Sequence, residues 1–216
     1  MREGTGIEII TGLYGKGTPE ENELVTRVFG DDRAAAWFEL YFYWYNLIHE
    51  LGHGVMWFYC NPRPHPVEEE VLVNQFAVAY WRHYGETEKL AALKDLLAYA
   101  LQQYVRPTDK NAIDYAKEAW DQKMIFNFNN YGWFQMSCVA DIMQNPIGLH
   151  AVLEQMGVPN VASQPEKLLR YDLNDETPTC IVRDAAAILR EWGAELPDVH
   201  VSFDNDPNRH MSVIHE

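Results

Sequence analysis

Two histidines and one glutamate, His49, Glu50 and His53, stand at the spacing best suited to chemistry in this chain, within the segment H-E-L-G-H. Residues four positions apart lie on one face of a helix, so the two imidazoles could converge on a single metal ion. In the H-E-x-x-H pattern the histidines bind zinc and the glutamate is the general base. The alternative, a plain helix core, would leave the Glu50 carboxylate among apolar neighbours at a considerable cost. The pattern therefore predicts a metal site.

A catalytic zinc needs three protein ligands and one open position. A third histidine six residues after the second is absent, because Tyr59 stands there. The next predicted helix opens with three consecutive glutamates, of which Glu70 is the favoured ligand. Asn74 and Ala77 share its helical face, the first able to hydrogen-bond a ligand and the second small enough for close packing. The two preceding glutamates are expected to be a solvated helix start, with Glu69 as the alternative ligand.

The H-E-L-G-H segment, followed on the next helix by E-x-x-x-N-x-F-A, resembles the gluzincin metallopeptidases, and especially the ImmA/IrrE-like group. The resemblance covers residues 45–78. It implies a Zn²⁺ ion held by His49, His53 and Glu70, with Glu50 as the catalytic base.

The motif and the resemblance predict a zinc-dependent hydrolase. Most simply, this would be a metallopeptidase that cleaves a peptide or protein. In this hypothesis Glu50 takes a proton from the attacking water and passes it to the leaving amine. The oxyanion needs a further donor. Tyr131, in a polar loop predicted over residues 127–132, is the first candidate, ahead of His65 and His150. The alternative is a non-catalytic binding or regulatory protein that retains the metal site.

A di-iron carboxylate site is a rival interpretation, in which Glu50 and His53 form a Glu-x-x-His motif. Such sites need a second motif of this kind and two further glutamates on partner helices. The sequence contains no second Glu-x-x-His, and Glu39 would lie about three helical turns from Glu50. A single zinc site is therefore favoured.

The composition limits the partners and the compartment. With 17 Lys and Arg against 32 Asp and Glu, the 216-residue chain has a formal net charge of −15, which disfavours nucleic acid and anionic membranes. The most apolar stretch, residues 34–48, contains Glu39 and is shorter than the about 20 residues that span a bilayer. No signal-peptide pattern is seen and the three cysteines form no close pair, so a cytoplasmic protein is expected. The aromatic stretch 37–45 leaves an oligomer contact open.

Apolar periodicity, caps and breakers predict a mainly α, multi-helix single domain over residues 1–216, with a small β element. Helices are expected at residues 18–30, 31–60, 66–84, 87–104, 108–123, 133–144, 148–156, 164–171 and 177–192. A strand is expected at residues 7–10 and a hairpin from the runs 199–203 and 211–215. To bind an extended peptide, these strands would have to form a sheet beside the H-E-L-G-H helix.

Overall fold

The computed structural model describes residues 6–162, 164–165 and 167–204, and it has the expected mainly α architecture with a small sheet. The helices are α1 (Pro19–Phe29), α2 (Asp31–Leu40), α3 (Asn46–Tyr59), α4 (Pro66–His83), α5 (Thr87–Gln103), α6 (Ala112–Asp121), α7 (Phe128–Gln144), α8 (Leu149–Gln155) and α9 (Thr177–Glu191). Short helical turns cover Tyr41–Tyr45 and Met124–Phe126, and the strands are β1 (Ile7–Gly12) and β2 (Val199–Asp204). Within these described ranges, no helix is both long and apolar enough to cross a membrane.

Side-chain caps fix where α1 and α4 begin. The Thr18 hydroxyl accepts a hydrogen bond from the Glu21 N–H, and the Glu21 carboxylate accepts one from the Thr18 N–H. This reciprocal pair satisfies two N–H groups that the first turn of a helix leaves without partners. At the start of α4, the His65 Nδ1 atom accepts from the Val67 N–H. The start of α4 is thereby set so that Glu70 follows one turn later, facing α3.

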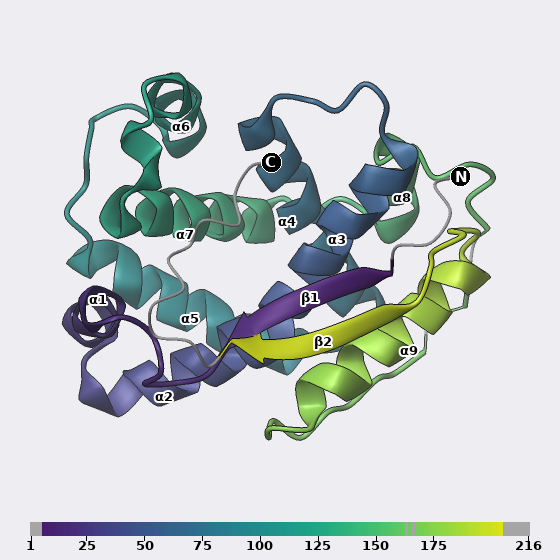
Figure 1. Ribbon diagram of the computed structural model, residues 1–216, viewed down its shortest axis with the longest axis horizontal. Helices are drawn as coiled ribbons and strands as arrows, with labels where there is room; N and C mark the ends of the chain where they lie inside the picture. Colours follow the sequence, from purple (N-terminus) through teal and green to yellow (C-terminus); the bar gives the residue numbers. More distant parts are fainter. Residues whose placement is uncertain (1–5, 163, 166, 205–216) are drawn as a thin grey trace.

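Helices α3 and α4 lie side by side at the centre of the fold (Figure 1). Gly52 allows the close approach, because a Cβ atom there would lie 3.0 Å from Phe76 Cδ1 and 3.1 Å from Val73 Cβ. Ala77, expected to be the small residue at this contact, is fully buried on α4. Helices α5, α7 and α8 also pack against α4, so α4 is surrounded and its buried polar groups need partners within the protein.

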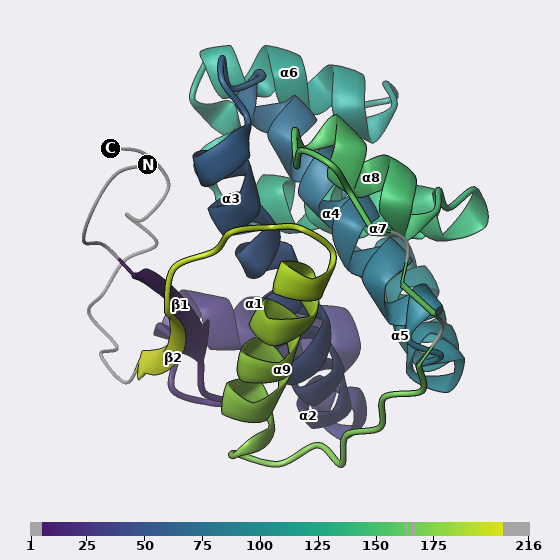
Figure 2. The ribbon, with the colours of Figure 1, turned by 90° about the vertical axis from the view of Figure 1, so that its right-hand side faces the viewer.

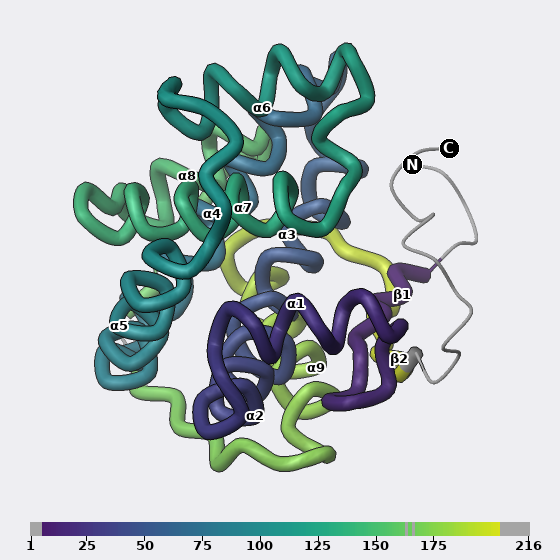
Figure 3. The backbone as a smooth tube through the Cα atoms, turned by 90° about the vertical axis from the view of Figure 1, so that its left-hand side faces the viewer, coloured from purple at the N-terminus to yellow at the C-terminus, as the bar shows by residue number. Residues whose placement is uncertain are grey.

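The two strands pair in parallel, with Ile7 opposite Val199. Figure 2 shows this sheet at one edge of the molecule beside α9, and Figure 3 shows α1 and α2 from the opposite side. β1 also packs on α3, where the absence of a side chain at Gly54 makes room for Ile7. The predicted N-terminal strand is confirmed. Residues 199–203 are also a strand, but one paired with β1, and the run 211–215 of the expected hairpin lies outside the described residues.

The helix expected over residues 31–60 is continuous but contains a π-helical turn at Tyr41–Tyr45, directly before the histidines. Neighbouring elements pin this turn. The Thr11 hydroxyl of β1 donates to the Phe42 carbonyl, and the Trp44 ring stacks on Trp81 of α4 with centroids 4.6 Å apart. π turns are often found at functional sites, and this one helps to set the rotation of α3 relative to α4 and β1.

Two predicted elements are wrong. Residues 127–132 were expected to form a loop, but α7 begins at Phe128, because the Asn127 side chain caps it by accepting from the Asn130 N–H. Residues 164–171 were expected to form a helix, but none of the described residues there is helical. Instead, the Leu169 N–H donates to the Tyr84 carbonyl and Arg170 to the Gly85 carbonyl, so this segment pairs with the end of α4.

We predict that Gly52→Ala lowers the free energy of unfolding by about 1–3 kcal/mol, although alanine is the better helix former, because the added methyl group collides with α4. Urea denaturation followed by tryptophan fluorescence measures this. Adding Val73→Ala should make the double variant lose less than the sum of the single losses. Gly148→Ala is the control, since a Cβ there meets nothing within 4 Å. A Gly52→Ala protein as stable as the original would contradict the packing described.

Candidate metal centre

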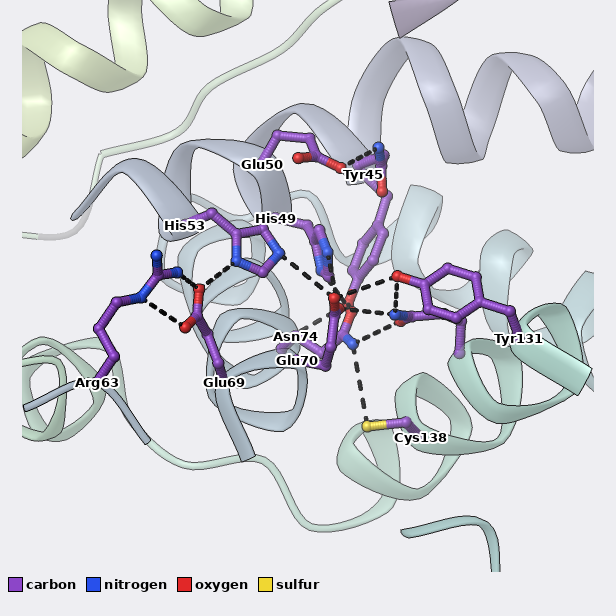
Figure 4. Close-up of polar contacts among 12 residues, drawn as sticks. Tyr45, His49, Glu50, His53, Arg63, Glu69, Glu70, Asn74, Tyr131 and Cys138 are labelled. Atoms are coloured by element: carbon purple, nitrogen blue, oxygen red, sulfur yellow. Dashed lines mark hydrogen bonds and ion pairs between the residues drawn. The ribbon is translucent and has the colours of Figure 1, made fainter. Parts of the chain in front are cut away.

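His49 and His53 of α3 and Glu70 of α4 come together in the interior, and their ligand atoms all lie within 4.8 Å of one another. The His49 Nε2 atom is 3.3 Å from one Glu70 oxygen, and the His53 Nε2 atom is 3.7 Å from the other. Figure 4 shows both rings directed at the Glu70 carboxylate. The structure thus brings together the three residues that the sequence singled out, and the His49 and Glu70 side chains are only 4% and 7% exposed.

The tautomer of His49 follows from a chain of hydrogen bonds that starts at Glu70. The ionised Glu70 carboxylate can only accept, so the atom of Gln135 that approaches it at 2.7 Å must be the amide nitrogen. The Gln135 oxygen then accepts from the Asn74 amide nitrogen at 3.0 Å. This leaves the Asn74 oxygen to face His49 Nδ1 at 2.9 Å, and it also accepts from the Tyr45 hydroxyl. Because the Asn74 oxygen can only accept, His49 carries a hydrogen on Nδ1, and its Nε2 atom is the one that faces Glu70.

His53 is oriented in the same way by Glu69. The Glu69 Oε1 atom lies 2.7 Å from His53 Nδ1, and Arg63 holds the same carboxylate through its Nε and Nη2 atoms. Glu69 was expected to be solvated, which is wrong: it is 5% exposed. Its charge is buried because an imidazole and a guanidinium together satisfy the carboxylate.

The charges around His53 and Glu70 favour the ionised form of each. Burial alone would lower the pKa of His53, but the hydrogen bond to Glu69 and the charges of Glu70 and Glu50 outweigh it and raise that pKa to about 9. Burial alone would raise the pKa of Glu70, but the hydrogen bond and charge of His49, the charge of His53 and the Gln135 hydrogen bond lower it to about 2. The surroundings of these two side chains therefore favour a positive charge beside the Glu70 carboxylate.

Helix α7 closes the far side of the group. The Tyr131 hydroxyl donates to Glu70 Oε1 at 3.1 Å, and the Gln135 amide donates both to Glu70 Oε2 and, at 2.9 Å, to the Tyr131 oxygen. Burial, together with the charges of Glu70 and Glu50, holds the pKa of Tyr131 well above its usual value, so the hydroxyl keeps its proton. Tyr131 is thus at the site as expected, but on the first turn of a helix rather than in a loop.

Glu50 lies on the open side, in a cleft of about 330 Å³ that it lines together with His53 and β1. It is half-buried, and its carboxylate accepts from the Asn46 side chain at 3.2 Å. β1 lies between β2 and α3 (Figure 1), and the Ile7 N–H bonds to the Asp198 carbonyl on the β2 side. Main-chain groups alternate along a strand, so those of Glu8 point away from β2, at the edge of β1 that no other described strand covers, called the free edge below.

Sequence reasoning missed Gln135, Tyr45 and Arg63. Gln135 had a signal, since it is a polar residue one helical turn after Tyr131 in an otherwise apolar stretch. His65 and His150, the other donor candidates, are engaged elsewhere: His65 caps α4, and His150 pairs with Glu154 at 3.3 Å.

Two imidazole nitrogens and a carboxylate form a donor set that suits divalent transition metals, so this group could hold a metal ion.

Comparison of the chain with protein families, curated proteins and solved structures found no match.

We predict that Asn74→Ala weakens divalent-metal affinity by about 10- to 100-fold, because His49 loses the oxygen that fixes its ring and tautomer. Competition with a chromophoric chelator measures the affinity. Asn46→Ala is the matched control, because its amide contacts Glu50 and no imidazole, and it should leave affinity unchanged. Equal loss in both variants would mean that Asn74 does not act through His49.

We also predict that metal uptake at neutral pH releases a proton from His53. Its pKa of about 9 means that the metal-free side chain is protonated, and a metal must displace that proton from Nε2. Affinity should therefore rise about tenfold per pH unit from neutrality towards pH 9. Calorimetry in buffers of different ionisation enthalpy counts the protons, and a binding heat independent of the buffer would contradict the prediction.

Proposed function

We propose that this protein is a zinc-dependent hydrolase, and specifically a metallopeptidase that cleaves a peptide or protein. The observation that carries the proposal is the orientation of the two imidazoles: both Nδ1 atoms are held by oxygen acceptors, so both Nε2 atoms face Glu70. Two histidines and one carboxylate, with an open side towards a cleft, are the ligand arrangement of catalytic zinc sites.

Zinc is the proposed metal because this ligand set is common for catalytic zinc, and His49, His53 and Glu70 would hold it. When bound, zinc would lower the pKa of water and polarise the carbonyl of the scissile bond. Tyr131 donates one hydrogen bond to Glu70 Oε1, and Gln135 donates one to Glu70 Oε2. Lone pairs therefore remain on both oxygens for a metal.

Glu50 is the proposed general base. It faces the cleft beside His53, and among the described residues its one side-chain hydrogen-bond partner is the neutral Asn46 amide, so its carboxylate is available to water. It would take the proton of the attacking water and deliver it to the nitrogen of the leaving amine. Tyr131, which keeps its hydroxyl proton next to Glu70, is the proposed donor to the developing oxyanion.

The free edge of β1 is the proposed binding surface for the peptide backbone. Gly6, Ile7, Glu8 and Ile9 line the same cleft as Glu50. An extended peptide could add to this edge through main-chain hydrogen bonds, which give affinity without demanding a particular sequence. The small sheet that the sequence analysis required beside the H-E-L-G-H helix is present, which supports a peptide rather than a small-molecule substrate.

We predict that Glu50→Gln keeps one zinc per chain but lowers peptide hydrolysis by about 10²- to 10⁴-fold, because the amide cannot accept the proton of water. Elemental analysis measures zinc, and a mixed library of quenched fluorogenic peptides measures hydrolysis. Glu39→Gln, an exposed position on α2, is the matched control and should match the original protein. If Glu50→Gln hydrolyses as well as the original protein, Glu50 is not the base. If zinc is present and neither protein hydrolyses any peptide, a non-catalytic binding protein is favoured.

A further inference from the structure

The candidate substrate cleft contains one strongly basic side chain. Among the described residues that line it, Arg63 is the one lysine or arginine, alongside two glutamates, Glu8 and Glu50. The Arg63 side chain is 40% exposed, so a ligand in the cleft can reach it. In Figure 4, Arg63 and Tyr131 lie on opposite sides of the histidines, so Arg63 marks one end of the site.

Arg63 is held in place before any ligand arrives. Pro62 and Pro64 flank it in the sequence and restrict the backbone on both sides. Its guanidinium binds both oxygens of the buried Glu69 and lies over the Trp57 ring, 5.4 Å from the centroid. A side chain fixed in this way loses little conformational freedom when it binds a further group.

The guanidinium still has capacity to bind. It carries five N–H donors in a planar fork, and Glu69 occupies two of them, on Nε and Nη2. Within the described part of the chain, the Nη1 group has no hydrogen-bond partner. Such a fork can bridge two carboxylates, with the second one coming from the cleft.

We propose that Arg63 binds a carboxylate of the substrate peptide and so determines substrate preference; this rests on the proposed metallopeptidase function. Arg63 and His53 share the Glu69 carboxylate, so the guanidinium lies within roughly 10 Å of the metal position. An extended peptide advances about 3.3 Å per residue, which places the carboxylate two or three residues from the scissile bond.

The rest of the cleft wall agrees with an apolar peptide that ends in, or carries, one negative charge. Ile7, Ile9, Trp57 and Phe58 provide its apolar surface. Glu8 and Glu50 would repel a carboxylate elsewhere in the cleft, so Arg63 would also fix the direction of the bound chain. The carboxylate can come from a peptide C-terminus or from an aspartate or glutamate side chain.

Binding of three fluorescein-labelled hexapeptides to the zinc-loaded Glu50→Gln protein tests the proposal without requiring hydrolysis. The first is Ala-Ala-Phe-Leu-Ala-Ala with a free C-terminus, the second its C-terminal amide, and the third the amide with glutamate as the last residue. We expect at least one acidic peptide to bind about tenfold or more tightly than the neutral amide by fluorescence anisotropy. Preference for the first alone identifies a C-terminal carboxylate, and preference for the third a side chain.

Adding Arg63→Gln should bring the affinity ratio of acidic to neutral peptide close to one. Arg33→Gln is the matched control, because Arg33 also lies over an aromatic ring, that of Tyr99 at 4.4 Å, but does not line the cleft. This control should leave the affinity ratio unchanged.

The proposal is overturned if the three peptides bind equally, if none binds at millimolar concentration, or if the affinity ratio survives Arg63→Gln. Equal weakening of all peptides together with weaker zinc binding would also overturn it, since Arg63 would then act only by positioning Glu69. Peptide hydrolysis by the unmodified protein without any acidic preference would support the proposed function and reject this inference alone.

Discussion

The direction in which two imidazole rings point is the constraint on which the rest of the site depends. A neutral histidine offers a lone pair at Nε2 only when its hydrogen is on Nδ1. The Asn74 oxygen fixes this for His49, and the Glu69 carboxylate for His53. The hydrogen bonds that orient Asn74 and His49 connect residues of α4, α7 and α3. The orientation of the His49 ring therefore depends on how these three helices pack.

Burying two adjacent carboxylates in a chain of net charge −15 needs local compensation. Glu69 is compensated by Arg63 and His53, and Glu70 by both histidines and two neutral donors from α7. A buried pair of this kind contributes little to stability, because desolvation offsets the attraction between the charges. A gain in stability therefore does not explain why these carboxylates are buried, and the His49, His53 and Glu70 group could hold a cation.

The sequence predicted the helical class, most helix positions and the His49, His53 and Glu70 group, because caps, apolar periodicity and i, i+4 spacing are local properties. It could not predict contacts that join distant residues, such as Gln135 with Asn74 or Arg63 with Glu69, since spacing along one helix does not reveal the neighbouring helix. The parallel pairing of β1 with β2 was missed for the same reason. Tyr131 was assigned to a loop because asparagine and glycine favour turns, whereas here Asn127 starts a helix.

The parallel pairing of β1 and β2 also sets the order of events during synthesis of the chain. β1 emerges from the ribosome early, but its partner follows only after α9, with nearly all of the described residues between them. Contacts of such high sequence separation form late and slowly. The helices around the histidines can pack first, while β1 acquires its neighbour only when β2 has been made. A nascent chain would therefore bring His49, His53 and Glu70 together before β1, which lines the neighbouring cleft, had its partner strand.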